Sequence, residues 1–424
     1  MNKTKELLRI ILFEKTWILI LLLAIILRVV LLFLLPVGQT PDEIFVFKRV
    51  WSEAIHIEEN SKYYSNNIYF YPPLYFLIAG LIIRVSGAIP SAFDQAFSFF
   101  YIHLRILSMT LSIASLFIIW KILEKIELNN NIRLAIFGFI ALLPSFVSSS
   151  VSVNHNNLLL FFVFIFIYLA FTANYQLRDY KKAAILGFIA GLSLLTKMDA
   201  IVLLPSLLIY VALAKNKKGL FKFITIFLMF ALIAGGWWYI WNFMHTGWFY
   251  PRDLAEASGI GFAKPFAFSN YLANVFLNTT FTFFAVYGVY NNIFIGLFAY
   301  QVFMAIFILS GIGIIIFLFK KALAIFKKAY LVHSLIFLMN LLIFLNFNLF
   351  YVFQPQGRYF FPSIIFISLG FVGGFSYWFK GKSLIFLPAF LIIALLFFNF
   401  WGIGCVTHYF YNVNFLPSIM GCLS

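Results

Sequence analysis

Long apolar segments separated by short polar connections recur along the whole chain. Most of these segments approach or exceed about 18 residues, which is enough for one α-helix to cross the hydrocarbon core of a bilayer. Because lipid offers no partner to open backbone groups, the pattern predicts helices. We therefore expect an all-α, polytopic transmembrane helical bundle of about eleven spans. The predicted spans are residues 17–36, 99–121, 132–150, 157–175, 183–197, 200–214, 221–241, 294–319, 329–352, 359–379 and 383–402.

Composition supports a membrane protein. Hydrophobic residues make up 63% of the chain and charged residues only 10%, whereas soluble proteins average about 25% charged residues. No segment is polar enough for a large soluble domain, so we expect residues 1–424 to form a single transmembrane domain. A net charge of +16 would suggest nucleic acid in a soluble protein, but here the basic residues flank apolar segments as cytoplasmic loops do. Whether Cys405 and Cys422 form a disulfide is open at this stage.

The positive charges predict a topology. Twenty of the thirty Lys and Arg residues fall into six clusters between the apolar segments. If all six clusters are cytoplasmic, the N-terminus is cytoplasmic and the C-terminus is outside. This arrangement requires residues 71–85 not to cross the membrane, so we expect an interfacial or re-entrant helix there. Residues 37–98 then form a first extracytoplasmic loop with juxtamembrane helices, and residues 242–293 form a second.

Unusual polar residues gather on this outer side of the predicted bundle. Ionisable groups in or beside membrane helices are costly, so each one is a functional candidate. Taken singly, each has an ordinary explanation, such as a snorkelling cation, an aromatic belt or a solvated loop. Their convergence on one face indicates a site. The candidates are the acids Asp42, Glu43 and Asp199, the bases Arg105, Lys197 and Arg358, and the residues Tyr71, Pro72, Pro73, Asn154, His155, Trp237, Asn242 and Tyr359.

These residue types point to one chemistry. Arg and Lys at membrane depth suit a lipid phosphate, which Arg can bind through two parallel hydrogen bonds. A nearby carboxylate suits a general base or a metal ligand. Aromatic surface suits a sugar face or an isoprenoid tail. A sugar linked to a lipid phosphate, with an acceptor outside, would use all three, and it requires Asp42 and Arg358 to border one cavity.

Short motifs in this order resemble a known family. The chain resembles the GT-C membrane glycosyltransferases, in particular the family 39 protein mannosyltransferases and the bacterial aminoarabinose transferases. Trp241 stands where relatives often carry Arg. The motifs are Pro41-Asp42-Glu43 after the first span, Tyr71-Pro72-Pro73-Leu74-Tyr75, Leu104-Arg105-Ile106-Leu107-Ser108, Gly191 to Lys197, Gly236-Trp237-Trp238-Tyr239-Ile240-Trp241-Asn242, and Gln356-Gly357-Arg358-Tyr359-Phe360-Phe361-Pro362.

The resemblance implies roles for several residues. Asp42 would be the catalytic carboxylate that activates the acceptor, and Glu43 would support it or help to bind the acceptor. Arg105, Lys197 and Arg358 would be candidates for the donor phosphate, Arg358 first, with Tyr359 beside it. The remaining candidates would line the substrate pocket.

The resemblance also implies the substrates. The donor would be a sugar on dolichyl or undecaprenyl phosphate, and the acceptor a glycolipid, polysaccharide or protein outside the cytoplasm, with inversion at the sugar carbon. It leaves open whether a divalent cation takes part, so the metal is unknown.

Two other functions compete with this interpretation. A lipid or solute transporter, or flippase, would spread its charges across both faces of the bundle and show inverted repeats. A surface polysaccharide polymerase or ligase would depend on arginines in the second loop, where residues 242–292 contain only Arg252. The one-sided placement and the Asp-Glu pair directly after the first span favour the transferase.

Overall fold

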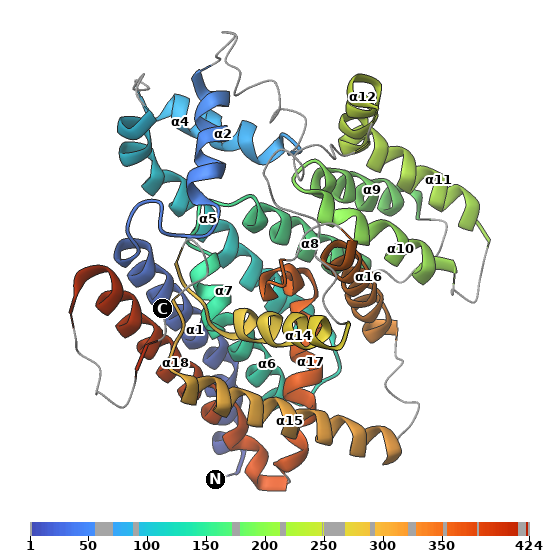
Figure 1. Cartoon of the computed structure of the whole chain (residues 1–424). Helices are drawn as coiled ribbons and strands as arrows, with labels where there is room; N and C mark the ends of the chain where they lie inside the picture. The colour runs from blue at the N-terminus through green and yellow to red at the C-terminus, as the bar shows by residue number, and fades with distance from the viewer. Residues whose placement is uncertain are drawn as a thin grey trace.

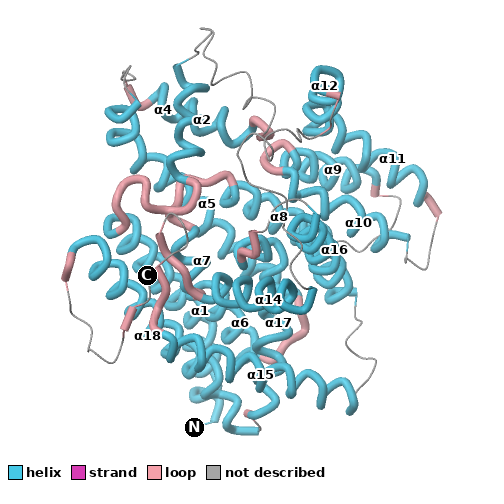
Figure 2. Tube along the Cα trace, in the orientation of Figure 1, coloured by secondary structure: helices cyan, strands magenta, loops and turns pink. Residues whose placement is uncertain are grey.

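The structure is a computed structural model of the whole chain, built almost entirely from helices (Figures 1 and 2). It describes residues 2–55, 71–87, 93–171, 179–212, 218–247, 249, 268–288, 293–320, 328–350, 354–379, 381–413 and 421–422. The predicted first and second loops therefore fall partly outside the described residues, and Arg252 does so as well. The described ranges contain no β-strand, only an isolated bridge between Tyr287 and Ile293.

Helices follow one another with short connections. They are α1 (Asn2–Leu34), α2 (Glu43–Ile55), α4 (Leu74–Val85), α5 (Phe93–Lys125), α6 (Asn130–Leu142), α7 (Pro144–Ser149), α8 (Asn156–Phe171), α9 (Tyr180–Leu194), α10 (Leu203–Ala212), α11 (Leu220–Ala231), α12 (Trp237–Thr246), α14 (Phe268–Phe284), α15 (Leu297–Lys320), α16 (Lys328–Phe350), α17 (Ile364–Phe375) and α18 (Phe386–Tyr411). Short 3₁₀ helices, Met198–Val202 and Gly357–Ser363, precede α10 and α17.

The predicted fold class is confirmed, because the chain is all-helical and carries membrane-length helices. Seven helices of the described residues are long and apolar enough to cross a membrane. Several other predicted spans are present as shorter apolar helices. The number of spans therefore stays a prediction.

The predicted helix over 132–150 is broken in two. Leu143 is extended (φ −60°, ψ 119°) and separates α6 from α7. Pro144 causes the break, because proline lacks a backbone N–H and disfavours the helical conformation in the residue before it. The break turns α7 and the following residues toward the centre of the molecule.

Two buried polar side chains satisfy the backbone at this break. The last carbonyls of a helix have no partner within it, and an unsatisfied carbonyl inside an apolar bundle is costly. Arg28 Nη1 donates to the carbonyl of Ala141 at 3.1 Å, and Asn399 Nδ2 donates to that of Leu142 at 2.7 Å. Arg28, predicted only as an unusual charge within the first span, thus joins α1 to α6.

The helices α2 and α4 lie at the end of the molecule opposite the N-terminus (Figure 1). At 12 residues, α4 has about 18 Å of length, too short to cross a bilayer. Its burial comes from a second hydrophobic core shared with α2, the start of α5 and the α7–α8 hairpin. The buried members are Val46, Phe47, Val50, Tyr75, Phe76, Ala79, Ile83, Ala96, Phe97, Phe100, Leu104, Val153 and Leu158.

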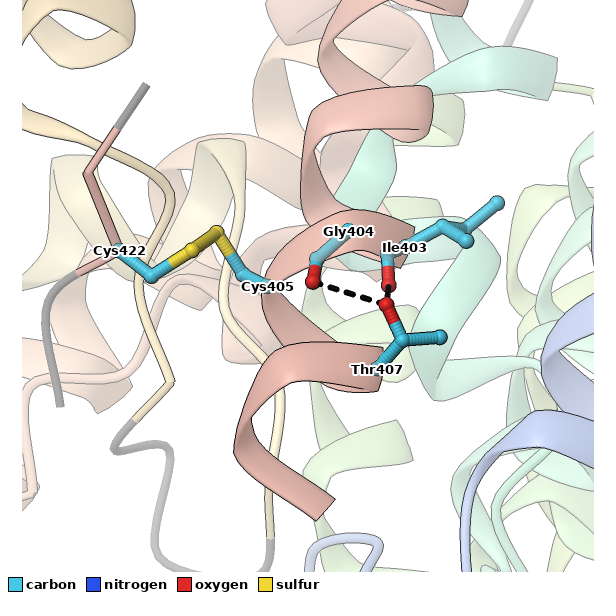
Figure 3. Close-up of a disulfide and its surroundings, with 5 residues drawn as sticks. All are labelled: Ile403, Gly404, Cys405, Thr407 and Cys422. Carbon is cyan, nitrogen blue, oxygen red and sulfur yellow. Dashed lines mark hydrogen bonds between the residues drawn. A yellow bond between two sulfur atoms is a disulfide. The ribbon is translucent and has the colours of Figure 1, made fainter. Parts of the chain in front are cut away.

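A disulfide joins Cys405, in the last turns of α18, to Cys422 (Figure 3). It closes a loop of 17 residues and holds their Cα atoms 5.5 Å apart. At the same end of α18, the Tyr411 hydroxyl donates to the Leu34 carbonyl at 2.9 Å. The disulfide therefore lies at the end of the bundle where α1 finishes and the Asp42 turn begins.

We expect the Asn399→Leu variant to be less stable than the native protein by about 1–3 kcal/mol, because it leaves the Leu142 carbonyl buried without its donor. Thermal unfolding in detergent would measure this. The matched control is Thr407→Val on the same helix, whose hydroxyl donates only to the Ile403 and Gly404 carbonyls of α18 itself (Figure 3). Equal unfolding temperatures for the two variants would contradict the capping role of Asn399.

Candidate functional site

Asp42 lies in a tight turn between α1 and α2. Its backbone is left-handed (φ +63°), a conformation that Asp tolerates better than most residues. The turn is attached to the α7–α8 hairpin, because Thr40 Oγ1 donates to Ser152 Oγ at 2.9 Å and Ser152 Oγ donates to the Pro41 carbonyl at 3.1 Å. The backbone of Asp42 is thus fixed, while its side chain remains about half exposed (49%).

Glu43, the next residue, is fully buried and forms an ion pair with Arg105 of α5. Arg105 Nε donates to Glu43 Oε1 at 2.7 Å and Nη2 donates to Oε2 at 2.6 Å. The backbone N–H of Gly38 also donates to Oε2, at 3.0 Å. The remaining guanidinium hydrogens are donated to carbonyls at the end of α1, those of Leu32, Leu35 and Pro36.

Arg358 reaches the site from the 3₁₀ helix before α17. The backbone on either side of it is held in place: Gly357 N–H donates to Thr282 Oγ1 of α14 at 2.8 Å, and the Tyr359 carbonyl accepts from Asn340 Nδ2 at 2.9 Å. Gly357 is required here, since a Cβ at this position would lie 2.2 Å from the backbone of Phe283. The helix α14 was not predicted, and its approach fixes where Arg358 begins.

Asp42 and Arg358 form an ion pair, with 2.9 Å between Asp42 Oδ2 and Arg358 Nη2. Asn154 Nδ2 lies 3.4 Å from the same oxygen. Arg358 Nε donates to Gln356 Oε1 at 2.7 Å, which orients the guanidinium. The two residues are 316 positions apart in the sequence, and the structure brings them together as the predicted site requires.

A second ion pair lies beside the first. Lys197 Nζ is 2.7 Å from Asp199 Oδ2 and donates to Asn156 Oδ1 at 2.9 Å. The ammonium also lies 5.2 Å from the centroid of the Tyr359 ring, a distance at which a cation is attracted to an aromatic face. Lys197 leaves the end of α9, which packs closely on α11 and α12 because Gly191 and Gly235 meet without side chains.

Two adjoining cavities open on these ion pairs. The first has an empty volume of about 360 Å³ and the second about 250 Å³. Arg358, Asn156, Leu160 and Phe361 line both. The first is otherwise lined by Pro41, Phe146, Ser149, Ser152, Asn154 and Asn157, and the second by Leu159, Lys197, Asp199, Tyr359 and Pro362.

The first cavity contains residues that were not among the candidates. Ser149, Ser152 and Asn157 supply hydroxyl and amide groups, and Phe146 and Phe361 supply aromatic faces. The polar run from Ser148 to Asn157 between two apolar segments was a signal for this wall. The contribution of Phe146 had no such signal, because any phenylalanine of an apolar helix looks alike in sequence.

Some predicted candidates pack behind the cavities instead of lining them. Tyr71 and the buried Pro72 lead into α4, whose first N–H, that of Leu74, donates to the carbonyl of Leu195 at 3.0 Å. Pro73 caps α4. This segment therefore braces the end of α9, from which Lys197 projects.

His155 is buried against the rings of Tyr71, Tyr75 and Phe76. Burial lowers the pKa of its imidazole well below 6.5, and the positive charges of Lys197 and Arg358 lower it further. A histidine in this setting is neutral at physiological pH. It therefore adds no positive charge beside the two cations.

The remaining candidates also fall outside the cavity walls. Arg105 and Glu43 bind each other, and a phosphate-binding role for Arg105 stays a prediction without support from its geometry. Trp237 is about half exposed on α12, and Asn242 is buried on the same helix. The neighbouring Tyr239 connects α12 to α9 by donating its hydroxyl to the Leu194 carbonyl at 2.8 Å.

The side chains around Asp42 do not fit a divalent cation as they are arranged. A metal site needs several oxygen or nitrogen ligands around one point, and within the described ranges no three His, Cys, Asp or Glu side chains come together in this way. The immediate neighbour of Asp42 Oδ2 is the guanidinium of Arg358, which would repel a metal ion. We assign no step to a metal.

Comparison with known proteins supports this assignment of fold. Residues 72–241, about two fifths of the chain, match the model of the dolichyl-phosphate-mannose-protein mannosyltransferase family. The match includes the Pro-Pro segment, Arg105, the α7–α8 hairpin and Lys197, and it excludes Asp42 and Arg358. Comparison of the sequence with curated proteins gave no match.

Solved structures of an oligosaccharyltransferase from Archaeoglobus fulgidus are similar in fold. The apo form has a TM-score of 0.53 at 12% identity over 93% of this chain and 56% of the relative. A form with Zn and sulfate has 0.51 at 13% identity over 91% and 52%. A form tethered to an acceptor peptide has 0.53 at 12% identity over 93% and 55%. The present chain thus spans a little over half the length of these relatives, and the resemblance to the GT-C fold is confirmed.

We expect Glu43→Gln to lower the stability by about 3–5 kcal/mol, because breaking a buried ion pair leaves the Arg105 charge without compensation. The matched control is Glu124→Gln, which breaks the partly exposed Lys121–Glu124 pair on the same bundle and should change the stability by less than about 1 kcal/mol. The measurement is the unfolding temperature of each variant in detergent. A Glu43→Gln variant as stable as the control would show that the pair is not the anchor of the turn.

Proposed function

We propose that the chain is a membrane glycosyltransferase that moves a sugar from a polyprenyl phosphate donor to an acceptor outside the cytoplasm. One observation carries the proposal: a half-exposed carboxylate, Asp42, lies 2.9 Å from a largely buried guanidinium, Arg358, beside a cavity that hydroxyl, amide and aromatic groups line. The GT-C fold and the match to the mannosyltransferase family agree with it.

Each group has a chemical role in this reaction. Asp42 removes the proton from the acceptor hydroxyl or amine, whose oxygen or nitrogen attacks the anomeric carbon of the sugar. The bond between that carbon and the phosphate oxygen breaks, and the polyprenyl phosphate leaves with the bonding electrons. Arg358 and Lys197 stabilise the negative charge on the leaving phosphate. A single displacement of this kind inverts the configuration of the anomeric carbon.

The two cavities suggest how the donor is divided between them. The second cavity carries both cations, Arg358 and Lys197, and suits the phosphate. The first carries Ser149, Asn154 and Asn157 with the ring of Phe146, and suits the hydroxyls and apolar face of a sugar. Arg358 lines both, where the bond to be broken would lie.

A transporter or flippase is the weaker candidate. Substrate pathways in transporters lie near the middle of the membrane, between repeated halves of the bundle. The ion pairs here lie instead beside the Asp42 turn that follows α1. A flippase would move a lipid-linked sugar across liposomes without an acceptor, and such activity would contradict the transferase.

The disulfide gives independent support for the side of the membrane on which the reaction takes place. Disulfides persist in oxidising compartments outside the cytoplasm. The Cys405–Cys422 bond lies at the end of α18 that meets the end of α1, next to Asp42. The distribution of Lys and Arg predicts the same side, by an argument that does not use the cysteines.

A labelling experiment tests this orientation. In a Cys405→Ala/Cys422→Ala background, a cysteine introduced by Val413→Cys, in an exposed position just after α18, should react with a membrane-impermeant maleimide in intact cells. Lys382→Cys, exposed near the opposite end of α18, should react only after the cells are opened. The reverse pattern would place the candidate site in the cytoplasm.

We expect Asp42→Asn to reduce glycosyl transfer by roughly 10²–10⁴-fold, the usual contribution of a general base. Mass spectrometry of surface glycans and glycolipids from a deletion strain would identify the missing sugar. Complementation with wild type should restore that sugar, and complementation with Asp42→Asn should not.

Asp94→Asn is the matched control, because it removes an exposed carboxylate from the first turn of α5. It should restore the sugar as well as wild type does when both variants reach the membrane in equal amounts. Full restoration by Asp42→Asn would remove Asp42 from the mechanism.

A further inference from the structure

Both cations of the site are covered by carboxylates. The side chains of Arg358 and Lys197 are 13% and 16% exposed, whereas those of their partners Asp42 and Asp199 are 49% and 36% exposed. The negative groups therefore lie on the open side of each pair. Each cation has an acidic partner in the position that a phosphate would occupy.

Asp42 and a donor phosphate would compete for the same donors. Arg358 Nε is occupied by Gln356 Oε1, and Nη2 by Asp42 Oδ2. A phosphate binds an arginine best through two parallel hydrogen bonds from the fork of the guanidinium. It cannot take both bonds while the carboxylate holds Nη2, and its own charge repels the carboxylate.

The proposed function gives the two partners incompatible requirements. A general base needs a lone pair directed at the acceptor, and a phosphate-binding arginine needs free N–H groups. Neither requirement is met while Asp42 and Arg358 bind each other. Both are met at once when the pair opens.

We propose that the Asp42–Arg358 ion pair is a latch that donor phosphate opens, so that the donor must bind before the acceptor can be activated. The inference rests on the proposed function. A phosphate that takes over the guanidinium releases the carboxylate toward the acceptor. A carboxylate that loses a cationic partner and gains an anionic neighbour also holds a proton more tightly, which suits a base.

The geometry allows the carboxylate to move while the arginine stays. Contacts with Thr282 and Asn340 hold the backbone on both sides of Arg358. The backbone of Asp42 is held through the neighbouring Glu43 and Thr40, so only its half-exposed side chain can turn. Asn154 Nδ2, already 3.4 Å from Oδ2, offers the carboxylate a hydrogen bond that remains once the arginine is lost.

The test is the affinity of purified full-length protein in nanodiscs for undecaprenyl phosphate. Asp42→Asn should bind this lipid roughly five- to tenfold more tightly than wild type, because the competitor for Arg358 is gone while the amide keeps the shape of the side chain. Asn also tolerates the left-handed backbone of position 42. The same variant should be inactive in transfer, so tighter binding and lost catalysis would occur together.

Two controls separate the latch from a general effect of charge. Asp94→Asn removes the same charge elsewhere and should bind the lipid as wild type does. In an Arg358→Gln background the gain from Asp42→Asn should disappear, since the two side chains would no longer be coupled. A gain that persists in that background, or no gain in Asp42→Asn itself, would overturn the latch.

The outcomes also distinguish the latch from the proposed function. Wild type that binds no undecaprenyl phosphate, together with an Asp42→Asn variant that binds none, would overturn both. Wild type that binds the lipid, with an inactive Asp42→Asn variant of unchanged affinity, would overturn the latch alone and leave the transferase in place.

Discussion

The buried ion pair between Glu43 and Arg105 holds the site together. A charge taken out of water is very unfavourable unless its partner and its hydrogen bonds are complete. Both conditions are met here, because the guanidinium binds two carboxylate oxygens and three carbonyls at the end of α1. The end of α1, the start of α2 and the middle of α5 thus become one unit. Asp42 is the residue directly before Glu43, so its position follows from this unit.

The rest of the site is fixed by the same physical demand, that buried polar groups be satisfied. The break before Pro144 creates carbonyls that Arg28 and Asn399 satisfy, and α7 then turns toward the centre. The hairpin after α7 holds the Asp42 turn through Ser152 and lines the first cavity. Polar residues that looked like separate candidates therefore divide into a framework and a small reactive centre.

The sequence predicts much of this fold because its signals are local. Apolar length and the clusters of Lys and Arg predicted the helices, the short α4 and the side on which the candidates gather. It did not predict that Arg105 binds Glu43, because that choice depends on two helices meeting 62 positions apart. The helix α14 was missed for a different reason. Its Asn and Thr residues resemble a loop, although no Gly or Pro interrupts residues 268–284.

The Asp42–Arg358 pair explains why a site of this kind can lie at the edge of a membrane. A buried cation alone would be costly, and a carboxylate alone would be solvated and unselective. Together each lowers the cost of the other, yet the pair remains open enough, with the acid about half exposed, to be separated by a stronger ligand. A dianionic phosphate carries more charge than a carboxylate and matches the planar guanidinium equally well. The stability of the empty site and its readiness for a phosphate thus come from the same contact.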